Sequence, residues 1–236
     1  MKRLQTNNEA ESYENELHHL AAEIAWVSAR CHTLGARIEA DQEADEVPAS
    51  VPVLVEAGAD GKAATDAERK VARLAAQEVG LRRQTDACLA ATTESGRMLG
   101  LECLVREYDL EQVEATVLLL AAIPAVGMDL YETLGSLGSF GFAIMSVSPE
   151  LVAVFGDLDL TGRVRLRGLL DENSRLVQAG LVEVGWDTSD ALQDFWTATI
   201  HLTPKAYRVL VGEALEQPTD GHCPACGQSR RVVAEA

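Results

Sequence analysis

Three features that would assign this 236-residue sequence to a common class are missing from it. No G-x-x-x-x-G-K-[ST] phosphate loop occurs; the nearest string, residues 58–63, has the wrong spacing and no hydroxyl residue after Lys62, so we expect no nucleotide hydrolysis. The longest uncharged apolar run, residues 115–128, contains Pro124 and Gly127 and is too short to cross a bilayer. The N-terminus has no apolar segment of the kind found in secretory signals.

Aromatic and basic residues are both scarce. Aromatic residues make up 5% of the chain against 47% hydrophobic residues in total, which together with abundant alanine predicts a folded, largely helical protein. Only 20 Lys and Arg face 37 Asp and Glu, a net charge of -17. Such a surface repels phosphate backbones, so we expect no nucleic-acid partner unless basic residues cluster. Five cysteines, an odd number, fit a reducing compartment, and we expect a cytoplasmic location.

The first part of the chain predicts two long amphipathic helices. Apolar residues recur at helical spacing through residues 11–44, and a second such pattern starts at Thr65, which can form a capping box with Glu68. The intervening segment is acidic and contains prolines. We therefore divide this part into an N-terminal helix (1–40), an acidic flexible linker (41–62) and a second long helix (63–96). Neither helix can bury its apolar face alone, so we expect them to pack as a hairpin.

The next part, residues 97–213, predicts short helices followed by two strands. The helices are expected at 109–123 (ended by Pro124), 129–137, 149–156 (capped by Ser148), 161–179 (interrupted at 171–174) and 204–210, and the strands at 181–184 and 195–202, joined by a polar loop at 185–194. This order is that of a winged-helix domain. The predicted fold class is α+β, predominantly α: a long-helix hairpin, a winged-helix domain and a tail at 214–236.

Three stretches of this domain resemble a known family. They are LGLECLVREYDLEQVEATVLLLAAIPAVGMDLYETLGSL, SPELVAVFGDLDLTGRVRLRGLLDENSRLVQAGLVEV and IHLTPKAYRVLVGE, and they resemble the winged-helix N-terminal region of a group of prokaryotic AAA+ ATPases. The ATPase module itself is absent from this chain. The resemblance implies a non-enzymatic interaction or adaptor module that recruits substrate or assembly partners to an AAA+ ATPase or oligomer. No set of residues has a local context that would support nucleophilic or acid–base catalysis.

Arginines in the helix expected at 161–179, which is the recognition helix of the predicted winged-helix order, define a candidate partner or DNA face. These are Arg163, Arg167 and Arg175, of which the first two share a helix face. An alternative function follows from them: a dimeric winged-helix transcription regulator whose long helices dimerise and whose arginines contact DNA. Acidic residues lie in the same stretch and in the polar loop at 185–194, which is the wing of the predicted domain. They disfavour contacts with phosphate and favour a face that is solvated or contacts protein.

The tail carries the sequence HCPACG, in which Cys223, Cys226 and His222 are candidate zinc ligands. CPxCG is the usual knuckle of a zinc ribbon, but one knuckle supplies only two or three of four ligands. Two hypotheses stay open. In the first, a second chain, a partner or further sequence completes a zinc site; completion by a second chain would make the protein a homo-oligomer. In the second, the tail carries two free thiols. A redox pair has no thioredoxin-like context here.

Overall fold

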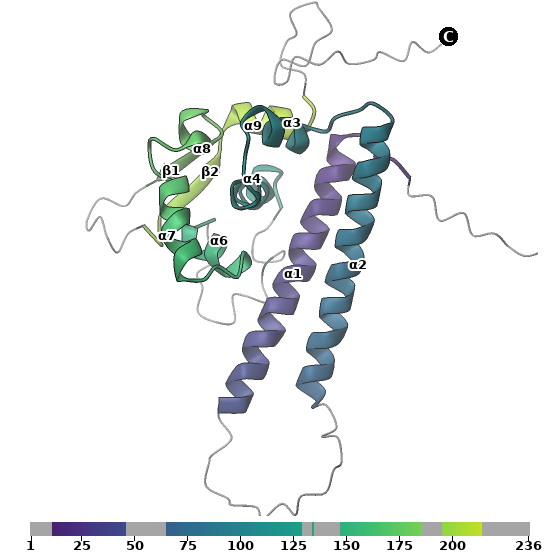
Figure 1. Ribbon diagram of the computed structural model, residues 1–236, viewed down its shortest axis with the longest axis vertical. Helices are drawn as coiled ribbons and strands as arrows, with labels where there is room; N and C mark the ends of the chain where they lie inside the picture. The colour runs from purple at the N-terminus through teal and green to yellow at the C-terminus, as the bar shows by residue number, and fades with distance from the viewer. Residues whose placement is uncertain (1–10, 46–64, 129–133, 135–146, 186–194, 214–236) are drawn as a thin grey trace, which may run out of the picture.

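The computed structural model describes residues 11–45, 65–128, 134, 147–185 and 195–213. Two long helices lie side by side, next to a compact body of shorter helices and a small sheet (Figure 1). This arrangement confirms the predicted fold class, α+β and predominantly α. Among the described residues, no helix is both long and apolar enough to span a membrane.

The hairpin consists of α1 (Glu16–Asp45) and α2 (Asp66–Glu94). The predicted capping box of α2 is present: the Thr65 hydroxyl accepts from the Glu68 amide at 3.1 Å, and the Glu68 carboxylate accepts from the Thr65 amide at 2.6 Å. Helix α1 runs from Glu16 to Asp45, which agrees with the end of the helical pattern expected at residues 11–44 and extends into the first residues of the expected linker (41–62). The reason is that residues 41–45 contain no proline or glycine that would stop the helix.

The body is built around α4 (Gln112–Ala125), whose residues from Val117 to Ile123 are all buried. The other elements are α3 (Gly100–Glu107), α6 (Pro149–Phe155), α7 (Leu160–Leu169), α8 (Arg175–Gln178), β1 (Val182–Gly185), β2 (Thr199–Leu202) and α9 (Pro204–Leu210). Two expected boundaries of α4 were wrong. Asp109 has a φ of 49° and cannot open a helix, and Pro124 lies inside the last turn of α4 instead of ending the helix before it.

The two strands pair antiparallel, with Val182 opposite Leu202 and Val184 opposite Ile200. The Ile200 amide also donates to the Val147 carbonyl at 2.8 Å, so the segment before α6 adds to this sheet edge. The strand expected at 195–202 is shorter, because Phe195 and its next two residues form a turn. The helix expected at 129–137 and the loop expected at 185–194 lie outside the described residues, apart from Leu134 and Gly185.

Local signals in the sequence placed several element ends correctly. The Ser148 hydroxyl caps α6 and the Ser174 hydroxyl caps α8, each by accepting an amide hydrogen bond. Gly180, after α8, takes a left-handed conformation, with a φ of 62°. Helix α3 was missed. It packs so closely on α9 that a Cβ at Gly100 would lie 2.0 Å from the Val209 carbonyl oxygen.

The hairpin docks on the body through α1. Its Ile24, Val27 and Cys31 belong to the same buried apolar cluster as α4. Arg30 strengthens this joint: its Nε donates to the Phe155 carbonyl at 2.7 Å, and its guanidinium lies 5.2 Å from the centre of the Phe155 ring. Hairpin and body therefore share one core.

Candidate interaction surface

Helix α7 and the short helix α8 occupy the place of the recognition helix in the winged-helix order. The Asp159 carboxylate caps α7 by accepting from the Gly162 amide at 2.7 Å. Leu166, Leu170 and Leu176 are fully buried and fix both helices on the body. Arg163 and Arg167 lie on the other faces of α7, and Arg175 is the first residue of α8.

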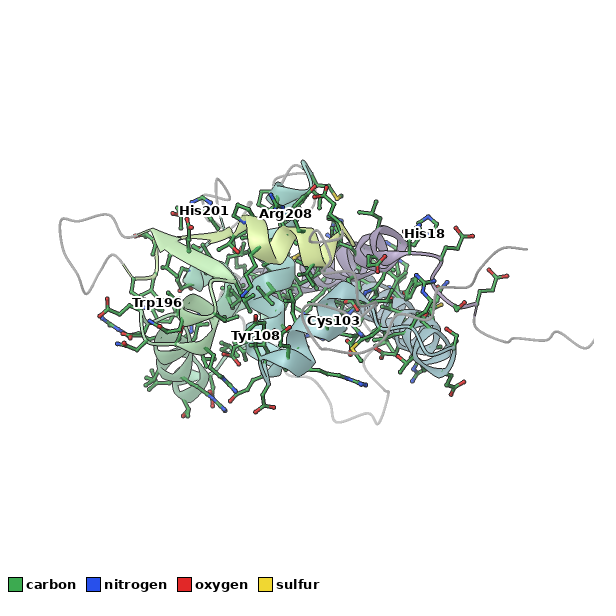
Figure 2. All side chains as sticks on the ribbon, turned by 90° about the horizontal axis from the view of Figure 1, so that it is seen from above. His18, Cys103, Tyr108, Trp196, His201 and Arg208 are labelled. Carbon is green, nitrogen blue, oxygen red and sulfur yellow. The ribbon has the colours of Figure 1, made fainter. Side chains whose placement is uncertain are left out.

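Arg163 and Arg167 lie over two aromatic rings, Trp196 and Phe195, in the turn just before β2. The Arg163 guanidinium is 5.3 Å from the centre of the Trp196 ring, and that of Arg167 is 5.4 Å from the centre of the Phe195 ring. The two rings meet edge to face at 4.9 Å. Trp196 lies on the side of the body opposite His18 of the hairpin (Figure 2). Both guanidinium groups are thus stacked on rings of the body, with Arg163 half-buried and Arg167 exposed.

Arg163 also forms an ion pair with α6. Two of its nitrogens donate to the two carboxylate oxygens of Glu150, at 2.8 and 3.3 Å. This bidentate geometry fixes the guanidinium more firmly than a single contact would. Arg167 makes no ion pair with any residue that the structure describes.

Arg165 and Arg175 converge on acidic residues at the start of α4. Arg165 donates to Glu111 at 2.6 Å, and Arg175 donates to Glu114 at 2.9 Å. Glu114 is fully buried, and the same oxygen accepts from the Glu111 amide at 2.8 Å. Its other oxygen has no hydrogen-bond partner among the described residues. Arg175 therefore neutralises a buried carboxylate, a structural role that the sequence did not reveal.

One exposed strip along α7 is apolar. Leu160 is 79% exposed and Val164 is 68% exposed, the two most exposed large hydrophobic residues of the described chain. One turn further on, Gly168 faces open space, with no atom within 4 Å of a Cβ built there. At about 100° per residue these three positions lie within about 80° of one another around the helix. We call this set, Leu160, Val164 and Gly168, the α7 strip.

A buried polar cluster lies between α1 and α2, and sequence analysis missed it. His19 and Glu23 are almost fully buried, with Nε2 and Oε1 3.4 Å apart. Arg82 donates to Glu23 at 2.9 Å and stacks 5.0 Å from the centre of the Trp26 ring. Burial lowers the pKa of Arg82, but hydrogen bonds and charges from Asp86 and Glu23 outweigh it and raise this pKa above its ordinary value.

The hairpin also holds two groups whose pKa values rise through burial. Burial raises the pKa of the Cys31 thiol to about 12, and it raises the pKa of the Tyr13 hydroxyl. A thiol held protonated in this way is a poor nucleophile and a poor metal ligand. Cys31 therefore acts as a small core residue.

No metal site is found in the part of the chain that the structure describes. No group of three or more His, Cys, Asp or Glu residues there could hold a metal ion. The predicted ligands Cys223, Cys226 and His222 lie outside this part. Two hollows of about 550 and 470 Å³ lie between hairpin and body and share Trp26, Gln112 and Thr116.

Comparison with known proteins supports the architecture seen here. No curated protein and no solved structure gives a match. The family model described as "winged helix domain, variant" matches residues 1–219, which includes the hairpin as well as the body. The chain therefore belongs to this variant winged helix domain family.

Proposed function

We propose that this chain is a non-enzymatic adaptor module whose winged-helix body contacts protein and not DNA. One observation carries the proposal: the recognition helix presents leucine and valine to solvent, while two of its three arginines, Arg163 and Arg165, are paired with carboxylates of the body. Leu160 and Val164 point outward, whereas Arg163 is bound to Glu150. Exposed apolar side chains gathered on one face are typical of protein contacts.

The charges of the body support the same conclusion. A helix that reads DNA places free Arg and Lys against phosphates and base edges. Here Arg165 and Arg175 are paired with Glu111 and Glu114, and the net charge of the chain is -17. DNA would have to compete with these internal carboxylates as well as with long-range repulsion.

The adaptor role in its specific form rests on the resemblance of residues 97–213 to the region that precedes AAA+ ATPase modules. The family match itself concerns the winged helix domain. We propose that the chain recruits a substrate or assembly partner to such an ATPase. It would supply docking surfaces and no chemistry.

A second candidate, DNA binding by a dimer, has one observation in its favour. Arg167 is exposed and has no acidic partner among the described residues. As the one arginine of α7 without an acidic partner among the described residues, Arg167 gives one or two phosphate contacts in a dimer. That is few against the 6–10 contacts that give tight, strongly salt-dependent binding.

A duplex-DNA titration tests the proposal. A fluorescently labelled duplex of about 30 base pairs, titrated at about 50 mM salt with up to about 100 μM protein, should show no saturable change in anisotropy. Saturable binding that weakens as salt is raised and is lost in Arg163→Ala/Arg167→Ala would count against the proposal. The matched control is Arg69→Ala/Arg73→Ala on the exposed face of α2.

A further inference from the structure

The α7 strip has the properties of a self-complementary surface. Val164 lies at its centre, with Leu160 four residues before it and Gly168 four residues after it. When two α7 helices pack antiparallel about a two-fold axis through Val164, each Leu160 lies opposite the partner's Gly168. A large side chain then meets an open position, since nothing lies within 4 Å of a Cβ at Gly168. Large residues facing small ones allow close helix packing.

We propose that the occupant of the α7 strip is a second copy of this chain, packed antiparallel along α7. The proposal rests on the protein-contact function proposed above and names one partner for it. Leu160 and Val164 would leave solvent on both chains, and a two-fold axis would place the same residues on each side. The two hairpins would lie outside this contact.

The charges that flank the strip match the same arrangement. Arg167 is exposed without an acidic partner among the described residues, and Asp157, just before α7, is exposed without a basic one. In the antiparallel pair, Arg167 lies three residues beyond the axis and the partner's Asp157 lies seven residues before it. The offset is about four residues, or about 6 Å along the helix, which an arginine side chain can span. A parallel arrangement would leave both charges unpaired.

The size of the contact sets the strength to expect. Two helices of ten residues bury less than the roughly 1,200 Å² of a standard stable interface. The dissociation constant should therefore be weak, on the order of tens of micromolar. Detection needs concentrations up to about 500 μM.

Sedimentation equilibrium over about 5–500 μM provides the measurement. The mass of the wild type should rise with concentration from 25.4 kDa towards twice that value. Val164→Asp and Gly168→Gln should each raise the dissociation constant at least about tenfold. Gly168→Gln adds a good helix former at an open position, so this variant stays folded. The matched control is Val79→Asp on α2, at 47% exposed, which should leave the association unchanged.

A charge exchange between chains tests the antiparallel orientation. Arg167→Glu and Asp157→Lys should each weaken self-association, because like charges then meet. An equimolar mixture of the two variants should associate as well as the wild type, since every contact in the mixed dimer again joins opposite charges. Circular dichroism checks that both variants keep the wild-type helix content.

Three results would overturn this inference. They are a wild type that stays at 25.4 kDa up to about 500 μM, a dimer that neither Val164→Asp nor Gly168→Gln weakens, or a mixture of charge variants that associates no better than each variant alone. The proposed function is judged separately, by the DNA titration, so a monomeric chain that does not bind duplex would remove the second copy as partner and leave the adaptor role standing.

Discussion

The hairpin and the body are held together by different interactions. Helix α4 of the body buries seven consecutive apolar residues, Val117 to Ile123. Helix α2 of the hairpin buries only Thr85 and Thr92, both polar. Three ion pairs join α2 to α1: Arg30 pairs with Glu78 at 3.0 Å, Arg82 with Glu23 at 2.9 Å and Lys70 with Glu39 at 2.5 Å.

This difference shows that charge has two structural uses in the chain. In the hairpin, ion pairs supplement the apolar contacts of half-buried side chains of α2 such as Leu74 and Leu81. In the body, where α4 already supplies a core, ion pairs hold the arginines of α7 and α8 against α4 and α6. In both regions ion pairs hold some of the basic side chains internally, among them Arg163, Arg165 and Arg175 of α7 and α8.

The largest expected contrast is between equivalent truncations in the two regions. Leu120→Ala in α4 removes a fully buried side chain and should lower the free energy of unfolding by about 2–5 kcal/mol. Leu74→Ala in α2, where the side chain is only half-buried, should cost less than about 1.5 kcal/mol. Urea denaturation of both variants measures the difference. Equal losses would show that α2 rests on a core like that of the body.

Replacing a glycine by alanine should lower the free energy of unfolding in the body and raise it in the hairpin. At Gly100 a Cβ would lie 2.0 Å from the Val209 carbonyl oxygen, so Gly100→Ala must separate α3 from α9 and should cost about 1–3 kcal/mol. At Gly80 of α2 nothing lies within 4 Å, so Gly80→Ala should stabilise by about 0.5–1 kcal/mol. Thermal unfolding followed by circular dichroism gives both signs. Destabilisation by Gly80→Ala would mean that a neighbouring segment packs against α2 at this position.

Removing one ion-pair partner should matter only where the other partner is buried. Arg82→Ala leaves the carboxylate of Glu23, 5% exposed, without its cation and should lower the free energy of unfolding by about 1–3 kcal/mol. The control Arg69→Ala breaks an ion pair with Asp66 on the exposed surface of α2 and should cause no measurable change. If chemical denaturation shows equal effects, the buried cluster is not what holds the hairpin.

Alkaline pH should weaken the hairpin through Cys31. Its pKa is raised from 9.0 to about 12 in the folded chain, so the unfolded state loses its proton first. The stabilisation is complete below pH 9 and is lost between pH 9 and about 12, at up to about 1.4 kcal/mol per pH unit. Urea denaturation at pH 8 and pH 10 should show this fall. Cys31→Ala should fall less over the same interval, and an identical fall would assign the effect to other groups.

Short-range signals made much of the fold predictable from the sequence. The caps at Thr65, Ser148 and Ser174 act on amides only three residues away, and the apolar run of α4 predicts a central helix by itself. The end of α4 was misjudged because a proline is tolerated within a final turn. The second strand was drawn too long because Phe195 and Trp196 continue its alternation, although they form a turn beneath the arginines of α7.

The structure places Arg163, Arg167 and Arg175, the residues of the candidate partner or DNA face, on α7 and α8, and their role in binding stays a prediction. The sequence selected these three residues. It could not show that Arg175 is paired with Glu114, 61 residues away, or that Arg165 is paired with Glu111, 54 residues away. Partners so distant in sequence are brought together by the packing of α7 and α8 on α4. The exposure of Leu160 and Val164 depends on the same packing.

Releasing the arginines tests the central claim, that internal ion pairs keep this winged helix from binding DNA, most directly. Glu111→Gln/Glu150→Gln removes the partners of Arg165 and Arg163 without changing side-chain volume. Anisotropy titration with the same duplex at about 50 mM salt should show no binding by the wild type and weak, salt-dependent binding by the variant. Submicromolar binding by the wild type that the two substitutions leave unchanged would contradict the claim.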